Sequence, residues 1–192
     1  MLFRSNLPTL NYFLAQSYTA YTGTYMRGYS GVIAVSDYVQ GEGWFDGTTV
    51  STTSVITKSV NSPNVYTSGP ANADFEVVHV PLSPSYAHQL KVDIGSFSTG
   101  SSLPVIGQTS IGRYTISVPV NQLSASSSFV FRGIGTAPDQ TRLAYLKLTY
   151  PHAFTFAGES FSAYRMILPA DASTYSDRKS TRLNSSHIPL SR

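Results

Sequence analysis

The sequence predicts an all-β fold, an antiparallel β-sandwich of about seven to nine strands. Two observations carry this expectation. Apolar and polar residues alternate with period two in several short segments, as a strand with one buried face requires. These segments recur at intervals of roughly 10 to 20 residues, with Gly, Pro, Ser and Asn between them, which leaves no room for the helical crossovers of a parallel sheet.

Two early strands are expected before the central region. The segments that show them are Leu10–Ala15 and Gly31–Val35. The Ser- and Thr-rich stretch from Thr48 to Ala73 fits either a polar strand or a long loop. We leave this alternative open, because a run of small polar residues has no periodicity that would decide it.

Five central strands show the alternation most clearly. They are Phe75–Val80, Gln89–Ile94, Arg113–Val118, Ser127–Arg132 and Leu143–Tyr150. Pro81 and Pro151 are expected to end the first and the last of them, because proline has no N–H to donate to a strand ladder. A final hairpin of Ala153–Phe156 and Glu159–Met166, turning at Ala157–Gly158, completes the expected fold.

The chain divides into one sandwich domain over residues 1–176 and a tail over residues 177–192. Residues 177–187, from Asp177 to His187, match codon by codon the translation of a common sequencing adapter, and the last five residues fit its continuation. We therefore expect an artefactual, disordered tail and natural sequence up to about Ser176. Residues 1–176 lack a signal peptide or an apolar run long enough to span a bilayer, so we expect them to be an incomplete fragment of a larger protein.

The charge of the chain depends on this tail. Of 13 Lys and Arg residues the tail holds four, and of 10 Asp and Glu residues it holds one, so the remainder carries nine of each sign. The formal charge of +3 therefore gives no support to a nucleic-acid partner. Charged residues make up only 12% of the chain, typical of an extracellular β-module, and the absence of cysteine excludes a cysteine nucleophile within these residues.

The segment Gly41–Gly47 places the single tryptophan, Trp44, beside Phe45 and between carboxylates. We expect Trp44 and Phe45 to be core anchors of the sandwich. The alternative is a sugar-stacking platform with hydroxyl-binding acids. A second alternative is a calcium site formed by Asp37, Glu42 and Asp46, although no calcium-loop motif accompanies them.

No catalytic, cofactor-binding or metal-binding residues are predicted. His79, His88 and His152 show no metal-ligand spacing, and we interpret them as scattered histidines of the sandwich. The many serines include no G-x-S-x-G elbow and no Ser-His-Asp order that would indicate a hydrolase. No cofactor is expected.

Between Asn11 and Met166 the sequence resembles the β-sandwich region that precedes the peptidase domain in gingipain-type cysteine peptidases, especially the PorU-like sortases of the type IX secretion system. Asn11–Leu14 is similar to the family's Y-Y-F-L-T strand, and Gly41–Phe45 to its S-G-x-E-W-F-G segment. Phe75–Pro81 is similar to an F-x-F-x-x-P strand, and Leu143–His152 to a W-L-D-Y-I-E-L-N-x-x-R strand. Gly43, Asp46, Ala144 and Lys147 depart from these patterns, which favours a divergent relative.

The resemblance implies a non-catalytic segment of an envelope cysteine endopeptidase, whose His and Cys lie in a caspase-like domain further along the parent chain. It implies a place on the extracellular side of the outer membrane, with secreted cargo proteins and other secretion components as partners of the parent. It also implies a parent that removes C-terminal sorting signals from cargo. The charge balance and the absence of a long apolar run predict no nucleic-acid partner and no direct membrane insertion. The alternative is a stand-alone extracellular module that binds carbohydrate or protein.

Overall fold

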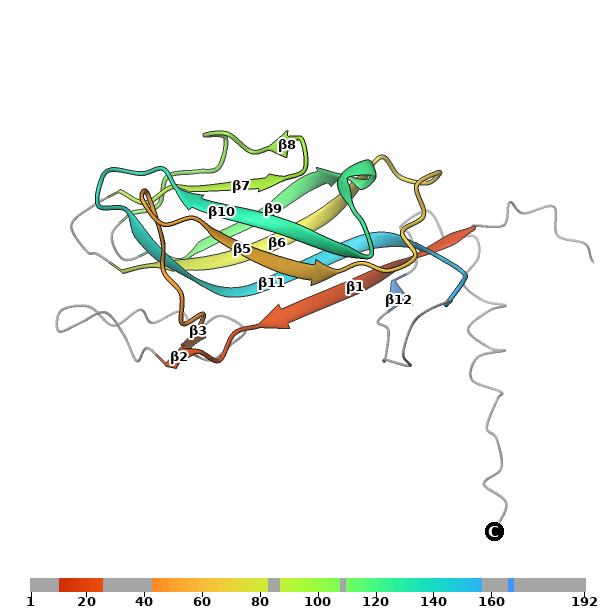
Figure 1. Ribbon diagram of the computed structural model, residues 1–192, viewed down its shortest axis with the longest axis horizontal. Helices are drawn as coiled ribbons and strands as arrows, with labels where there is room; N and C mark the ends of the chain where they lie inside the picture. The colour runs from red at the N-terminus through yellow and green to blue at the C-terminus, as the bar shows by residue number, and fades with distance from the viewer. Residues whose placement is uncertain (1–10, 26–42, 83–86, 108–109, 157–165, 168–192) are drawn as a thin grey trace, which may run out of the picture.

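The fold is a two-layered antiparallel β-sandwich (Figure 1). The computed structural model describes residues 11–25, 43–82, 87–107, 110–156 and 166–167. These residues contain one short 3₁₀ turn, η1 (Val120–Gln122), and no α-helix. No helix among them is long and apolar enough to cross a membrane. The predicted fold class is confirmed.

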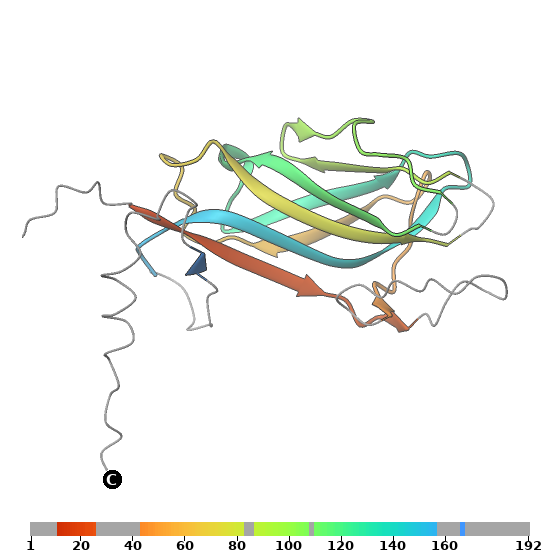
Figure 2. The ribbon, with the colours of Figure 1, turned by 180° about the vertical axis from the view of Figure 1, so that it is seen from behind.

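The larger sheet has the strand order β12-β1-β11-β6-β9, and β4 pairs with one end of β11. Its members are β1 (Tyr12–Ala20), β4 (Val50–Ser51), β6 (Asn72–Pro81), β9 (Gly112–Pro119), β11 (Gln140–Ala153) and β12 (Met166–Ile167). Every pairing is antiparallel. Figure 2 shows β1, β11, β6 and β9 side by side in this order.

The smaller sheet has the order β5-β10-β7-β8 and faces the larger one. Its strands are β5 (Ile56–Asn61), β7 (Leu90–Ile94), β8 (Phe97–Ser98) and β10 (Ser126–Gly133). A separate ribbon of β2 (Thr24–Tyr25) and β3 (Trp44–Phe45) lies beside the end of β1. Five of these strands have only two residues, which is too short for a period-two pattern to reveal them.

The main core fills the space between the two sheets. Side chains of the five strands β6, β7, β9, β10 and β11 supply most of it, and the sequence predicts a strand in each of these regions. At its centre Phe75 of the larger sheet stacks on Phe129 of the smaller one, with ring centroids 3.9 Å apart and planes 11° from parallel. Both side chains are fully buried.

A second apolar cluster lies on the opposite face of the larger sheet. Its members are Phe45, Val78, Val80, Ala144 and Tyr145. The register of β11 against β6 shifts between Leu143 and Tyr145, which marks a β-bulge at Ala144. The bulge, together with cover on both faces, explains why four consecutive residues from Leu143 to Leu146 are buried, contrary to simple alternation.

Of the two prolines expected to end strands, Pro81 does end β6, whereas Pro151 lies inside β11. Pro81 is the last residue of β6 and pairs with Thr141, and the next residue, Leu82, still donates its N–H to the carbonyl of Gln140 at 2.9 Å. Pro151 lies within β11 opposite Leu14, and its carbonyl accepts from the N–H of Tyr66 at 2.8 Å. Proline lacks only the donor, so its carbonyl continues the bonding of the strand.

The remaining strand predictions have mixed outcomes. The Thr48–Ala73 stretch contains both alternatives, since β4 and β5 form within it and loops connect them. Of the predicted closing hairpin, Ala153 belongs to β11, and Met166 lies in β12, which pairs with β1. The predicted turn at Ala157–Gly158 and residues 159–165 lie outside the described residues. Gly31–Val35 and the tail 177–192 lie outside the described residues.

The Phe75–Phe129 stack predicts where the fold is most sensitive. Replacing Phe75 with Ala should lower the free energy of unfolding by about 3–5 kcal/mol, because the cavity between the sheets cannot collapse fully. Urea denaturation followed by circular dichroism measures this loss. Val105 is 58% exposed, so Val105→Ala is the control and should stay within about 0.5 kcal/mol of the parent chain. Equal effects of the two substitutions would contradict the core assignment.

Candidate functional site: a buried histidine cluster

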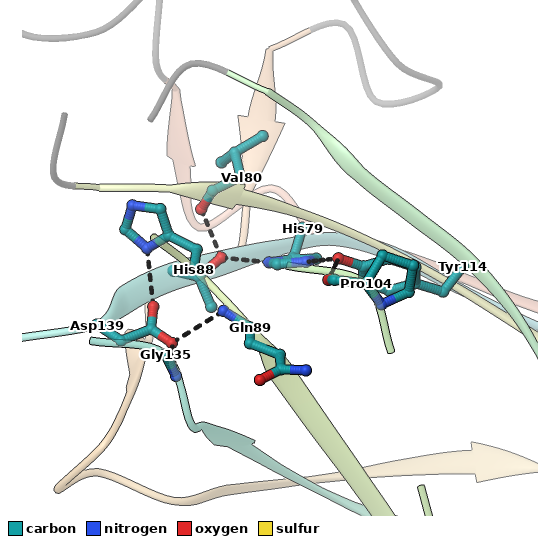
Figure 3. Close-up of polar contacts among 9 residues, drawn as sticks. His79, Val80, His88, Gln89, Pro104, Tyr114, Gly135 and Asp139 are labelled. Carbon is teal, nitrogen blue, oxygen red and sulfur yellow. Dashed lines mark hydrogen bonds and ion pairs between the residues drawn. The ribbon is translucent and has the colours of Figure 1, made fainter. Parts of the chain in front are cut away.

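A group of connected polar side chains is buried inside the sandwich (Figure 3). It contains His79, His88, Asp139 and Thr141, of which none is more than 1% exposed. Burying such groups is unfavourable unless their hydrogen bonds are made, so each contact bears on the stability of the fold.

His79 faces the interior because it continues the inward row of Phe75 and Val77 in β6. Its Nδ1 lies 2.7 Å from Oγ1 of Thr141, and that hydroxyl donates to the carbonyl of Val80 at 2.6 Å. The hydroxyl proton is therefore engaged, so Nδ1 carries the imidazole proton and donates it to Thr141.

The other ring nitrogen of His79 faces a tyrosine. Nε2 lies 3.3 Å from the hydroxyl of Tyr114, which donates to the carbonyl of Pro104 at 2.9 Å. The strand neighbour Gly112 makes room for the ring, because a Cβ at this position would overlap Nε2 of His79. With the proton on Nδ1, Nε2 carries none, and the Tyr114 proton goes to Pro104, so the 3.3 Å approach is a packing contact and the hydrogen bond to Thr141 holds the ring.

Burial decides the charge of this imidazole. Desolvation, and then the nearby His88, lowers the pKa of His79 to about 3. Desolvation and the charge of Asp139 raise the pKa of the Tyr114 hydroxyl to about 12. Both groups are therefore neutral throughout the physiological range, and neither is poised to exchange protons near neutral pH.

Asp139 holds the second half of the cluster. One of its carboxylate oxygens, Oδ1, lies 2.8 Å from Nδ1 of His88. The other, Oδ2, accepts from the backbone N–H of Gly135 at 2.7 Å and of Gln89 at 3.2 Å. A carboxylate with these donors is well compensated for its burial. It fastens the loop between β10 and β11 to the start of β7.

The backbone around Asp139 is equally close-packed. His88 exchanges two backbone hydrogen bonds with Ile106, at 3.0 and 2.8 Å. At Gly135 a Cβ would overlap the carbonyl of Ala87 and crowd the Asp139 carboxylate, so the close approach of this loop needs glycine. His88 and Asp139 therefore connect segments of both sheets.

The arrangement fits structural support better than catalysis. His88 and Asp139 have the geometry of a base and the acid that orients it, and Thr141 offers a hydroxyl beside His79. A substrate could not reach any of these atoms, because all four side chains are shielded from solvent. Among the described residues no group of three or more acidic, His or Cys side chains could hold a metal ion.

The structure brings His79 and His88 into one cluster, whereas the sequence analysis interpreted them as scattered histidines of the sandwich. His152 is also fully buried and stacks on Phe13 at 4.7 Å between ring centroids. Sequence reasoning missed Asp139, the carboxylate that orders the cluster. The signal available was only an Asp after Pro in a turn, a pattern so common that its burial could not be foreseen.

The prediction that Trp44 is a core anchor is wrong, while the same prediction for Phe45 is confirmed. Phe45 is 6% exposed, but Trp44 is 42% exposed and packs edge-on against Tyr25, 49% exposed, with ring centroids 5.2 Å apart. Successive side chains of a strand point to opposite faces, so burying Phe45 turns Trp44 outward. The spacing alone could not show which of the two aromatic residues faces the core.

Of the three proposed calcium ligands, only Asp46 belongs to the described residues; Asp37 and Glu42 lie outside them. Asp46 is already engaged by protein groups. Its Oδ2 lies 2.5 Å from Nζ of Lys58, and its Oδ1 accepts from the N–H of Thr48 at 3.2 Å. The Lys58 ammonium also lies 5.0 Å from the ring centroid of Tyr21. Asp46 therefore ties the β2–β3 ribbon to β5.

Together the described residues define a class of molecule: an antiparallel sandwich with an apolar core and a buried cluster of polar side chains at His79, His88, Asp139 and Thr141. Its fold is similar to that of PorU from Porphyromonas gingivalis, in a crystal structure of the dimeric latent protein, with a TM-score of 0.59 and 12% sequence identity. The match covers 81% of this chain and 14% of the PorU chain. No family model and no curated protein matches this sequence.

The buried His79 predicts a loss of stability in acid. Its pKa is about 3 in the folded chain and about 6.5 when unfolded, so between these values only the unfolded chain binds the proton. The contribution of neutral His79 to the free energy of unfolding is therefore fully present above about pH 7. The free energy of unfolding should fall by about 2 kcal/mol between pH 7 and pH 5. His79→Leu should remove this part of the pH dependence. Urea denaturation at pH 7, 6 and 5 compares the two chains, and parallel curves would contradict the assignment.

Proposed function

We propose that this chain is the non-catalytic β-sandwich of an envelope cysteine endopeptidase of gingipain type. The observation that carries the proposal is the fold similarity to PorU, which extends over 81% of the chain. The similarity of the motifs around Phe45, Phe75 and Leu143 to those of PorU-like sortases supports the same conclusion. In this proposal the catalytic His and Cys stand in another domain of the parent protein.

The proposed parent acts on the extracellular side of the outer membrane and removes C-terminal sorting signals from secreted cargo. The sandwich contributes a rigid body. Its polar cluster supports this role, because the hydrogen bonds described for His79, His88 and Asp139 connect strands and loops of the sandwich. Secreted cargo and other secretion components are then partners of the parent.

The source gene tests this proposal. The reading frame that encodes residues 1–176 should continue into an α/β domain with a paired His and Cys, and a stop codon soon after codon 176 would contradict it. The present chain should release nothing measurable above a buffer blank from fluorogenic peptide substrates. Hydrolysis that persists in a purified His88→Ala variant as well as in the parent chain would also argue against a purely structural module.

A second candidate function is a stand-alone extracellular binding module, favoured by the exposed pair Tyr25 and Trp44. Two large aromatic rings at the surface lose part of the stabilisation that burial would give, and such exposed aromatics are typical of binding surfaces. The ribbon that presents them is held by the burial of Phe45 and by the Asp46–Lys58 ion pair. It therefore offers the rings in a fixed position.

Substitution of Trp44 separates these functions. Trp44→Ala should lower the free energy of unfolding by only about 1 kcal/mol, since the side chain is 42% exposed. Its neighbour provides the matched control, because Phe45→Ala should cost about 3–5 kcal/mol. A glycan array then tests the binding module: signal from the parent chain that Trp44→Ala abolishes would favour it. A loss of stability from Trp44→Ala as large as that from Phe45→Ala would contradict the exposed position.

A further inference from the structure

Strand β9 forms one margin of the larger sheet. It pairs with β6 over its whole length, and no other described strand pairs with its far side. Figure 2 shows it at the border of the sheet, opposite β1. With eight residues it is four times as long as β12, the strand at the other end of the sheet order.

The register shows which backbone groups of β9 point away from the sheet. The N–H of Val120 donates to the carbonyl of Ala71 at 2.9 Å, just beyond the paired strands. Because hydrogen-bonded pairs alternate along an antiparallel ladder, the residues that bond to β6 are every second one back from Val120. The residues whose N–H and C=O face outward are then Arg113, Thr115, Ser117 and Pro119.

Pro119 agrees with this assignment, since a proline in a strand is tolerated where its missing N–H would face away from the neighbouring strand. The other three outward residues each present a donor and an acceptor. Their side chains are exposed. No backbone hydrogen bond joins them to any described residue outside the β6 ladder.

The edge lacks most of the devices that prevent strand association. Sheet edges are usually blocked by lysine, by proline within the strand, by a bulge or by an inward-pointing charge. Over β9 the register with β6 is unbroken, and Arg113 is the single charged residue. The inward row of Tyr114, Ile116 and Val118 is at most 7% exposed and anchors the strand in the core.

We propose that the β9 edge binds a second copy of this chain, strand against strand, in an antiparallel pair with its two-fold axis at Thr115. In this register Thr115 pairs with Thr115 of the partner subunit, and Arg113 pairs with Ser117 of the partner subunit. No charge lies opposite a like charge, and a Thr–Thr pair is favourable across strands. The pairing is isologous, as expected for a two-fold dimer.

This pairing joins the two larger sheets into one continuous sheet. It adds one hydrogen-bonded strand pair and little apolar area, which places the interface at the low end of specific protein interfaces. The dimer is therefore weak and concentration-dependent. The inference does not rest on the proposed peptidase parent, since the edge belongs to the sandwich itself.

Sedimentation equilibrium of the full 192-residue chain tests the proposal. The apparent mass should rise from 20.8 kDa towards twice that value as concentration increases. Thr115→Pro removes one outward donor without touching the β6 ladder, and should raise the dissociation constant at least tenfold. Thr115→Lys, which keeps the N–H and brings two ammonium groups together at the axis, should raise it about fivefold, the factor that ~1 kcal/mol represents.

Ser128→Lys is the control, because Ser128 is exposed on the internal strand β10 and the substitution adds the same charge away from the edge. It should leave the dissociation constant unchanged. Circular dichroism checks that each variant folds, and Thr115→Lys decides the matter if the proline variant does not. A parent chain that stays at 20.8 kDa at every concentration would overturn the proposal, as would a dimer that Thr115→Lys leaves intact.

Discussion

The structure depends on the pairing of β11 along both of its edges. This 14-residue strand pairs with β1 over nine positions on one edge and with β6 over eight positions on the other, and β4 joins its first residues. A strand with neighbours on both sides leaves few backbone groups to water, so it fixes the register of every strand that touches it. The bulge at Ala144 is the one local departure, and it lets both faces of β11 be buried at once.

Polar groups inside the sandwich add a second constraint, of a different kind from apolar packing. Apolar contacts tolerate small displacements, whereas hydrogen bonds weaken steeply with distance and angle. Asp139 needs His88, Gly135 and Gln89 in definite places, and His79 needs Thr141. The end of the sandwich that holds this cluster therefore has a single arrangement of loops, even though loops form much of it.

The sequence predicted those parts of the fold that a local pattern specifies. Alternation located β7 and β9 almost to the residue, with Leu90, Val92 and Ile94 inward as expected. It could not locate two-residue strands, and it could not foresee that Pro151 would remain within β11, with its carbonyl bonded to the N–H of Tyr66. The sequence could not show which of the neighbours Trp44 and Phe45 faces the core. The contact of His88 with Asp139 joins residues 51 positions apart, so no local sequence pattern predicts it.

The outward turn of Trp44 has a consequence for anyone who follows this protein spectroscopically. It is the single indole of the chain, and it lies on the β2–β3 ribbon outside both sheets. Its fluorescence therefore reports the attachment of the ribbon, while the near-ultraviolet signal of buried tyrosines such as Tyr114 and Tyr150 reports the sandwich. If the ribbon detaches before the sheets separate, the two signals will give different midpoints for one molecule, and only the tyrosine signal will measure the unfolding of the core.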